Sequence, residues 1–157
     1  MTVSAAETWA AEPLRRFVGD ARVTLALLLH RSGQVVAQHG FTRSVDVMAA
    51  CSLAAGILAS AGELGRMLDG RPFTVLHHGG EARQLFLAEV IAPVAPYLFL
   101  TVFDGESSFG LVRLYFDELA AAVAATAPEP AVVAQAALEE NFEWELNRNL
   151  AVLFGRA

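Results

Sequence analysis

The sequence predicts an α+β fold: a five-stranded antiparallel-type sheet sandwiched between helices, with a further helix at the C-terminus. Segments of strand character come as a pair before, and a group of three after, a long helical segment rich in Ala, Gly and Ser. The strands over 22–30 and 97–103 are apolar on both faces, which requires a packed layer on each side of the sheet. Helical periodicity marks one helix before the first strand and another after the last. Together these observations predict three layers.

The N-terminal part of the predicted domain is a helix followed by a hairpin. Pro13 can open the helix, because its missing N–H is not needed in the first turn, and Gly19 ends it. A turn at Ser32-Gly33 joins the strand over 22–30 to a returning strand over 34–39. This order predicts an antiparallel pair.

A long helix is predicted over 44–70. Ser44 is expected to cap it, Asp46 suits its positive first turn, and Gly70 after Asp69 ends it. Large apolar residues recur at helical spacing and are expected to face the sheet: Leu53, Ile57, Leu64 and Leu68. These signals define a helix with one sheet-facing stripe.

A strip of small residues adjoins that stripe, with Ser52, Gly56 and Ser60 four residues apart. Such residues lower helix propensity, by about 1 kcal/mol for Gly relative to Ala, and in return allow another backbone to approach closely. That backbone belongs either to the sheet of the same chain or to a second copy. We interpret this helix as a docking surface.

Three strands and a helix follow. The strands are predicted over 73–78, 82–91 and 97–103, with Gly79-Gly80 as a two-residue turn that needs positive φ. Ser108 is expected to cap a helix with a periodic apolar stripe, formed by Phe109, Val112, Phe116, Leu119 and Val123. Residues 12–127 should therefore form one domain.

Residues 128–157 are predicted to be a linker and a C-terminal helical extension. The segment Thr126–Pro130 contains two prolines, and a helix is expected over 132–154. Its apolar stripe comprises Leu138, Phe142, Leu146, Leu150 and Leu153, and Trp144 lies beside it. The extension either folds back on its own domain or offers Phe142, Trp144, Leu146 and Leu150 to a partner as a helix in a groove.

The composition excludes several function classes. All eleven basic residues are Arg, which excludes lysine Schiff bases and a Walker-type phosphate loop. The formal net charge of −6, with no extended basic cluster, argues against nucleic-acid binding. The 157 residues suit a single domain with a real core.

The same composition predicts a cytoplasmic protein without membrane insertion. The mean hydropathy of +0.44 is high, but much of it comes from Ala. The longest near-apolar run, over 48–62, is shorter than the roughly 20 residues that a spanning helix needs. Glu7 and Glu12 interrupt the N-terminus, which argues against a signal peptide, and the single Cys51 cannot form an internal disulfide.

No catalytic, metal or cofactor motif is visible in the sequence. Neighbouring His77 and His78 would point to opposite faces of a strand, and no His, Cys or carboxylate set has metal-ligand spacing. Cys51 is interpreted as a small buried thiol, and Ser107 and Ser108 as helix-capping residues. We therefore expect no enzymatic site.

Three segments carry a resemblance to a known family: the strand–turn–strand over 26–37, the Ala/Gly-rich segment over 53–60, and the opening of the last domain helix over 109–114. In this order they resemble the roadblock/dynein light chain family, and within it the bacterial MglB-like branch. The resemblance spans residues 14–125 and implies a roadblock/profilin-like three-layer sandwich.

The resemblance also implies a non-catalytic regulatory homodimer that binds a small Ras-like GTPase and modulates its cycle. The central helices would pack antiparallel, and the following strands would pair across the two-fold axis. The positions implied for the dimer or partner interface are Arg43, Ser52, Leu53, Gly56, Ile57, Ser60, Glu63, Arg66, Phe73 and Val75. An arginine finger at Arg66 is disfavoured, because roadblock activators reshape the catalytic residues of the GTPase itself.

Two alternatives stay open. One is a ligand-sensing domain of the PAS or GAF kind, which would need polar residues converging inside the core. The other is a scaffold for partners that are not GTPases.

Overall fold

The computed structural model describes residues 7–41, 43 and 45–129. Chain contacts divide the protein into two compact units, Met1–Ala127 and Pro128–Ala157. Only Pro128 and Glu129 of the second unit are among the described residues, so the predicted C-terminal helix lies outside them. The predicted contacts of that helix, at Phe142, Trp144, Leu146 and Leu150, lie outside them too.

The described residues of the first unit form three helices and five strands in the predicted order. The helices are α1 (Thr8–Ala21), α2 (Val47–Asp69) and α3 (Phe109–Thr126). The strands are β1 (Leu25–His30), β2 (Val35–Gly40), β3 (Val75–Gly79), β4 (Gln84–Val90) and β5 (Tyr97–Phe103). They form a single sheet in the order β2-β1-β5-β4-β3 in which each neighbouring pair is antiparallel.

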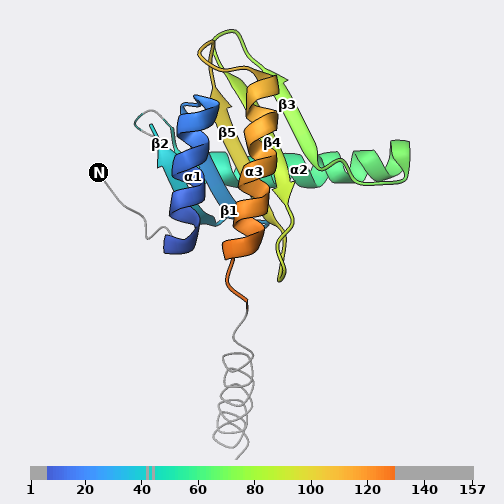
Figure 1. Cartoon of the computed structure of the whole chain (residues 1–157). Coiled ribbons are helices and arrows are strands. Elements are labelled where there is room, and N and C mark those ends of the chain that lie inside the picture. Colours follow the sequence, from blue (N-terminus) through green and yellow to red (C-terminus); the bar gives the residue numbers. More distant parts are fainter. Residues whose placement is uncertain (1–6, 42, 44, 130–157) are drawn as a thin grey trace, which may run out of the picture. The chain divides into compact units, whose positions relative to one another are not determined.

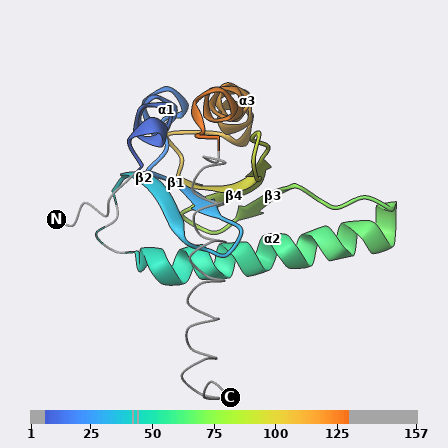
Figure 2. The same ribbon diagram turned by 90° about the horizontal axis from the view of Figure 1, so that it is seen from below.

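The helices cover both faces of this sheet. α1 and α3 lie side by side on one face and α2 crosses the other, as Figures 1 and 2 show. Successive residues of β1 therefore enter different cores: Ala26 and Leu28 pack beneath α1 and α3, whereas Leu25 and Leu27 pack beneath α2. The predicted three-layer α+β class is confirmed.

The start of α1 differs from the prediction. The helix begins at Thr8, so Pro13 lies inside it. The earlier turn forms because Ala10 is fully buried and the Trp9 ring packs 5.6 Å from that of Tyr97, measured between centroids. Burial outweighs the single helical hydrogen bond that Pro13 lacks.

The boundaries of α2 are set by Asp46 and Gly70. The Asp46 carboxylate accepts a hydrogen bond from the Ala49 N–H at 3.0 Å, so the cap is Asp46 and the prediction of Ser44 is wrong. The predicted stop is confirmed: Gly70 adopts φ 70° and its N–H donates to the Arg66 carbonyl.

The turn between β3 and β4 lies further along the chain than predicted. Gly79 pairs with Gln84 in the ladder, and the Gly80 N–H donates to the Arg83 carbonyl. The connection is therefore Glu81-Ala82. Neither Gly79, the last residue of β3, nor Gly80 has positive φ.

The cap of α3 is confirmed, and its stripe is confirmed except at its first residue. Ser108 Oγ accepts from the Leu111 N–H at 3.2 Å. The predicted stripe residues Val112, Phe116, Leu119 and Val123 are buried. Phe109 is 41% exposed, and its ring stacks on that of His77 in the edge strand β3, with centroids 4.6 Å apart.

The chain returns from α2 to β3 in close contact with the helix, and two glycines of α2 face this return in different ways. A Cβ at Gly65 would lie 2.4 Å from the Phe73 nitrogen and 2.6 Å from the Arg71 oxygen. A Cβ at Gly62 would meet only the Pro72 side chain, at an ordinary 3.7 Å. Gly65 is therefore the position that the close approach requires.

We predict that Gly65→Ala lowers the free energy of unfolding by about 1–3 kcal/mol, because backbone atoms must move to admit the methyl group. Gly62→Ala is the matched control, and it should raise the stability by up to about 1 kcal/mol through helix propensity. Urea denaturation of the three proteins at one concentration measures both changes. Equal effects of the two substitutions would contradict the close approach.

Candidate functional site: the exposed face of helix α2

The side of α2 that faces the sheet is built mainly from small residues. Its buried residues are Cys51, Ala54, Leu58, Ala61, Gly62 and Gly65. They meet a sheet face filled by leucines, namely Leu25, Leu27, Leu29, Leu87, Leu98 and Leu100. Because the sheet supplies the bulk of this core, the helix packs closely only where its own side chains are small.

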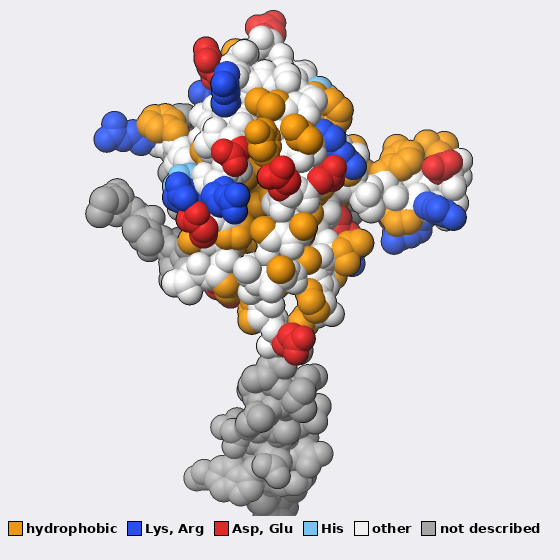
Figure 3. Space-filling model, viewed as in Figure 1, with side chains coloured by type: hydrophobic (Ala, Val, Ile, Leu, Met, Phe, Trp, Pro, Cys, Tyr) orange, Lys and Arg blue, Asp and Glu red, His pale blue; other side chains and the backbone are white. Residues whose placement is uncertain are grey.

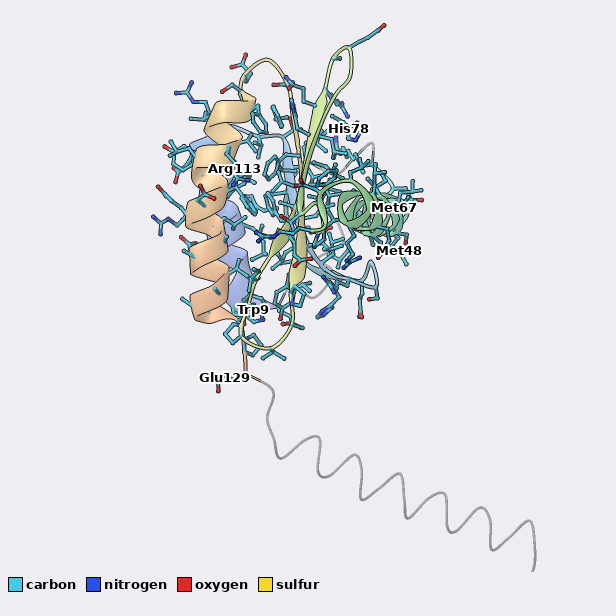
Figure 4. All side chains as sticks on the ribbon, turned by 90° about the vertical axis from the view of Figure 1, so that its right-hand side faces the viewer. Trp9, Met48, Met67, His78, Arg113 and Glu129 are labelled. Carbon is cyan, nitrogen blue, oxygen red and sulfur yellow. The ribbon has the colours of Figure 1, made fainter. Side chains whose placement is uncertain are left out.

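The large residues of α2 consequently point outward. The prediction that Leu53, Ile57, Leu64 and Leu68 face the sheet is wrong, because all four are exposed. Of the twelve exposed large hydrophobic side chains in the described residues, six lie on this helix. Leu53 is 67% and Met67 82% exposed, and Figure 4 shows Met48 and Met67 on the side of α2 turned away from the sheet.

The exposed residues follow the spacing of a helix–helix seam. Positions 53, 57, 60, 64 and 67 are separated alternately by four and three residues. This is the spacing that keeps one stripe of an α-helix against a partner helix in a coiled coil. The exposed face of α2 is therefore patterned for another helix.

The small strip on this face is also suited to being covered. Ser52 Oγ donates to the Met48 carbonyl at 3.0 Å, and Ser60 Oγ donates to the Gly56 carbonyl at 2.9 Å. Both hydroxyl groups thus keep a hydrogen bond inside the helix when water is removed. The side chains of the strip are exposed, while the backbone of Ser52 lies close to Gly33 in the turn between β1 and β2.

Gly56 has no packing role within the described domain. Apart from the adjoining residues and backbone of its own helix, no atom of the described residues lies within 4 Å of the position that its Cβ would occupy. A glycine inside a helix lowers stability by about 1 kcal/mol relative to Ala. Open space at such a position is what a close approach by a separate molecule would require.

The charged residues predicted for the interface lie toward opposite ends of the helix. Arg43 precedes α2, whereas Glu63 and Arg66 form an ion pair in its C-terminal half. A helix of 23 residues is about 34 Å long, so these groups cannot form one site. The C-terminal end of α2 runs past the β3 edge of the sheet (Figures 1 and 2).

A cavity of about 260 Å³ lies beside this half of the helix. Glu63, Arg66 and Phe73 line it, together with Arg31 and Glu89. Arg31 donates to the Glu89 carboxylate at 2.7 Å. Sequence reasoning missed this pair, although a carboxylate in an otherwise apolar strand was a usable signal for Glu89.

The strand next to α2 in the chain, β3, forms one edge of the sheet. Val75, the first residue of β3, is half-buried. Within the described sheet, β3 pairs with β4 alone. The His77 ring packs on Phe109, and its Nε2 lies 2.8 Å from Gln84 Oε1. Among the described residues, no three His, Cys, Asp or Glu side chains are grouped so that they could hold a metal ion.

α2 is also the one described helix whose length and composition would allow it to cross a membrane. Its most apolar window has a mean hydropathy of 1.6, and 28% of that window is buried. The near-apolar run judged too short to span a membrane covers only 48–62, whereas the helix that contains it has 23 residues. In this structure α2 packs on one face of the sheet.

Solved structures with a similar architecture include two MglB proteins. No family model and no curated protein matches the chain. Myxococcus xanthus MglB is 25% identical, with a TM-score of 0.68, over 75% of this chain and 94% of that one. The gliding protein MglB of Thermus thermophilus is 26% identical, with a TM-score of 0.69, over 81% and 94%. The domain resembles roadblock/LC7 domains of the MglB type.

A more distant structure supports the fold of this MglB-like domain. A Roadblock/LC7 domain from Streptomyces avermitilis is 19% identical, with a TM-score of 0.61, over 71% of this chain and 92% of that one. Identity at that level speaks for the fold alone. The resemblance inferred from the sequence is thereby confirmed.

Cys51 lies on the sheet-facing side of α2 with no exposed surface, and burial raises the pKa of its thiol. The folded protein therefore keeps the thiol protonated at a pH where the unfolded chain, with a thiol pKa of about 8.5, ionises it. Ionisation of the unfolded chain lowers stability as the pH rises. The chemistry is that of a core residue, not of a nucleophile.

We predict that the stability advantage of the wild-type protein over Cys51→Ala narrows between neutral pH and about pH 10. Urea denaturation at both pH values measures it. Tyr97, whose pKa burial also raises, is common to both proteins and cancels in the difference. A difference that does not change with pH would contradict this account.

Proposed function

We propose that this chain is a non-catalytic regulator: a homodimer that binds a small Ras-like GTPase and modulates its nucleotide cycle. The observation that carries the proposal is the uncovered apolar face of α2 in an MglB-like domain. A contiguous apolar surface of this kind marks an interaction site. A cytoplasmic location in a bacterium belongs to the same proposal.

The first part of the proposal is a dimer formed by two α2 helices. Leu53, Ile57 and Ser60 would lie in the seam, where Gly56 lets the backbones approach. Full burial of one Leu or Ile side chain contributes about 1.5–3 kcal/mol, so several such residues from each copy could offset the cost of association. One solved MglB structure has a tetrameric arrangement, which supports self-association in proteins of this type.

The β3 strands would extend this dimer. β3 is a short edge strand whose outer side is free within the described sheet. Pairing of two such edges across a two-fold axis would satisfy their backbone groups and join the two sheets. Phe73 and Val75, which were predicted for the interface, lie beside this edge or within it.

The second part of the proposal is a GTPase bound on the α2 side of the dimer. The C-terminal half of α2 offers Arg66, Glu63 and the adjoining cavity with Phe73. Arg and aromatic side chains are the residue types that most often anchor protein interfaces. Regulation would follow from different affinities for the two nucleotide states of the GTPase, which shifts its conformational equilibrium.

The alternatives gain less support. A ligand-sensing domain would place polar groups inside its core, but Thr101 is the one buried polar side chain among the described residues. Its hydroxyl donates to the Leu25 carbonyl at 2.7 Å and so serves the sheet. A scaffold for other proteins would use the same α2 face, and the binding experiment below distinguishes it.

We predict that Gly56→Leu converts the dimer to a monomer, because the new side chain would fill the space that the second helix requires. Sedimentation velocity at micromolar protein concentration measures the change. Gly19→Leu is the matched control: Gly19 also lies in a helix with no atom within 4 Å, but on α1, across the sheet. That variant should remain a dimer.

Two results would contradict the dimer proposal. One is a Gly56→Leu protein that remains dimeric. The other is a wild-type protein that sediments as a monomer throughout the micromolar range.

We further predict that the wild-type protein binds a small Ras-like GTPase of its own organism about tenfold more tightly in one nucleotide state. Biolayer interferometry with the purified GTPase, loaded with GDP or with a non-hydrolysable GTP analogue, measures both affinities. Arg66→Ala should weaken binding without changing sedimentation. Arg113→Ala, which removes an exposed Arg from α3, should leave both unchanged.

Single-turnover GTP hydrolysis on the same samples shows whether the complex speeds the reaction or only holds the GTPase. Binding of none of the organism's Ras-like GTPases in either state would overturn the GTPase proposal. It would leave the scaffold for other proteins as the interpretation of the α2 face.

A further inference from the structure

A second candidate surface lies on the face of the sheet opposite α2. A groove of about 270 Å³ runs between α1 and α3. Figure 3 views this face and shows hydrophobic side chains in a strip between the two helices, with both acidic and basic side chains beside it. The proposed function makes no use of this groove.

The groove has an apolar floor and aromatic walls. Phe17 and Leu119 are buried and form part of its lining from below. Trp9, Tyr115 and Ala122 are half-buried and also line it. Half-buried Trp and Tyr side chains are typical of sites that receive apolar groups from a partner.

The charged residues that line the groove are mostly acidic. Glu12, Asp20 and Glu118 are carboxylates, and Arg16 is the one cation among the lining residues. Arg15 donates to the Glu12 carboxylate at 2.6 Å and lowers its pKa, so the negative charge of Glu12 is balanced by Arg15. Asp20 and Glu118 have no ion-pair partner among the described residues.

Size and charge together select the occupant. The volume is below the roughly 300–1,000 Å³ of clefts that enclose a small molecule, but it suits one or two side chains of a partner helix. The acidic rim disfavours an anionic membrane surface and a second copy of the same face. It also disfavours the segment 130–157 of this chain, which contains four Glu and two Arg.

We propose that the groove between α1 and α3 binds a basic amphipathic helix of a partner protein. Its apolar side chains would insert between Trp9 and Tyr115 toward Phe17 and Leu119, as in helix-in-groove recognition. Its Lys or Arg side chains would lie along the rim formed by Asp20 and Glu118. The groove and the α2 face lie on opposite sides of the sheet, so this inference does not rest on the proposed function.

The test uses the full chain with Trp144→Phe, which leaves Trp9 as the only tryptophan. The probe is a designed helical peptide of about 18 residues, five turns, with one Leu stripe flanked by Lys. The control peptide has the same Leu stripe flanked by Glu. Trp9 fluorescence during titration should show binding of the Lys peptide about tenfold tighter than that of the Glu peptide. The difference should shrink as salt is added.

Variants locate the binding. Ala122→Arg fills the groove and should abolish the response, and Glu118→Lys, at an exposed position, should weaken it without disturbing the fold. Leu114→Arg is the matched control, because Leu114 is exposed on α3 but does not line the groove. Sedimentation of all variants should match the parent protein, which separates this result from the α2 proposal.

Three outcomes would overturn the inference: equal affinity for the two peptides, no change in Trp9 fluorescence, or binding that persists in both groove variants.

Discussion

The packing of α2 on a leucine-filled sheet face is the constraint on which the rest of this structure depends. Leucines from β1, β4 and β5 occupy that face, so the helix can approach closely only through Cys, Ala and Gly side chains. Leu58 is the one large residue that it contributes to this core. Closing the core therefore turns the other large residues of α2 outward.

This arrangement links the internal packing of the domain to its proposed work. The exposed stripe is apolar, spaced as a helix seam, and lined by hydroxyl groups that are already hydrogen-bonded. A helix that is hydrophobic all round is normally buried, and one sheet can bury only one side of it. A second molecule on the outer side would complete the burial, which is the physical basis of the dimer proposed above.

The two faces of the sheet differ in the partners that they suit. The α2 side has exposed apolar residues at intervals from Met48 to Leu68 and suits a self-complementary, two-fold contact. The α1/α3 side has a short apolar groove with a mainly acidic rim, and it fits a basic partner. Because the sheet separates them, both surfaces could be occupied at once.

Much of the fold could be predicted from the sequence, because apolar residues recur with a different period in helices and in strands. Both periods can be recognised within a short segment of sequence. The range 97–103 was predicted for β5 and is the observed strand, and Ser108 caps α3 as expected. The orientation of α2 could not be predicted, because its small and its large residues both recur at helical spacing. Which stripe faces inward depends on the leucines of distant strands.

Other differences also have a tertiary cause. Pro13 is a good helix start by local rules, but burial of Ala10 extends α1 by five residues. The turn predicted at Gly79-Gly80 lies instead at Glu81-Ala82, because the ladder between β3 and β4 continues through Gly79. In the candidate site, Arg31 and Glu89 are 58 residues apart, so no local pattern joins them.

The most direct measurement is an isotope-filtered nuclear Overhauser experiment on a mixture of methyl-labelled and unlabelled protein. Contacts between methyl groups of Leu53, Ile57 and Leu64 in one copy and protons of the other copy are the predicted result. A well-resolved methyl spectrum with no intermolecular contacts at these residues would contradict the claim that a second α2 covers this face.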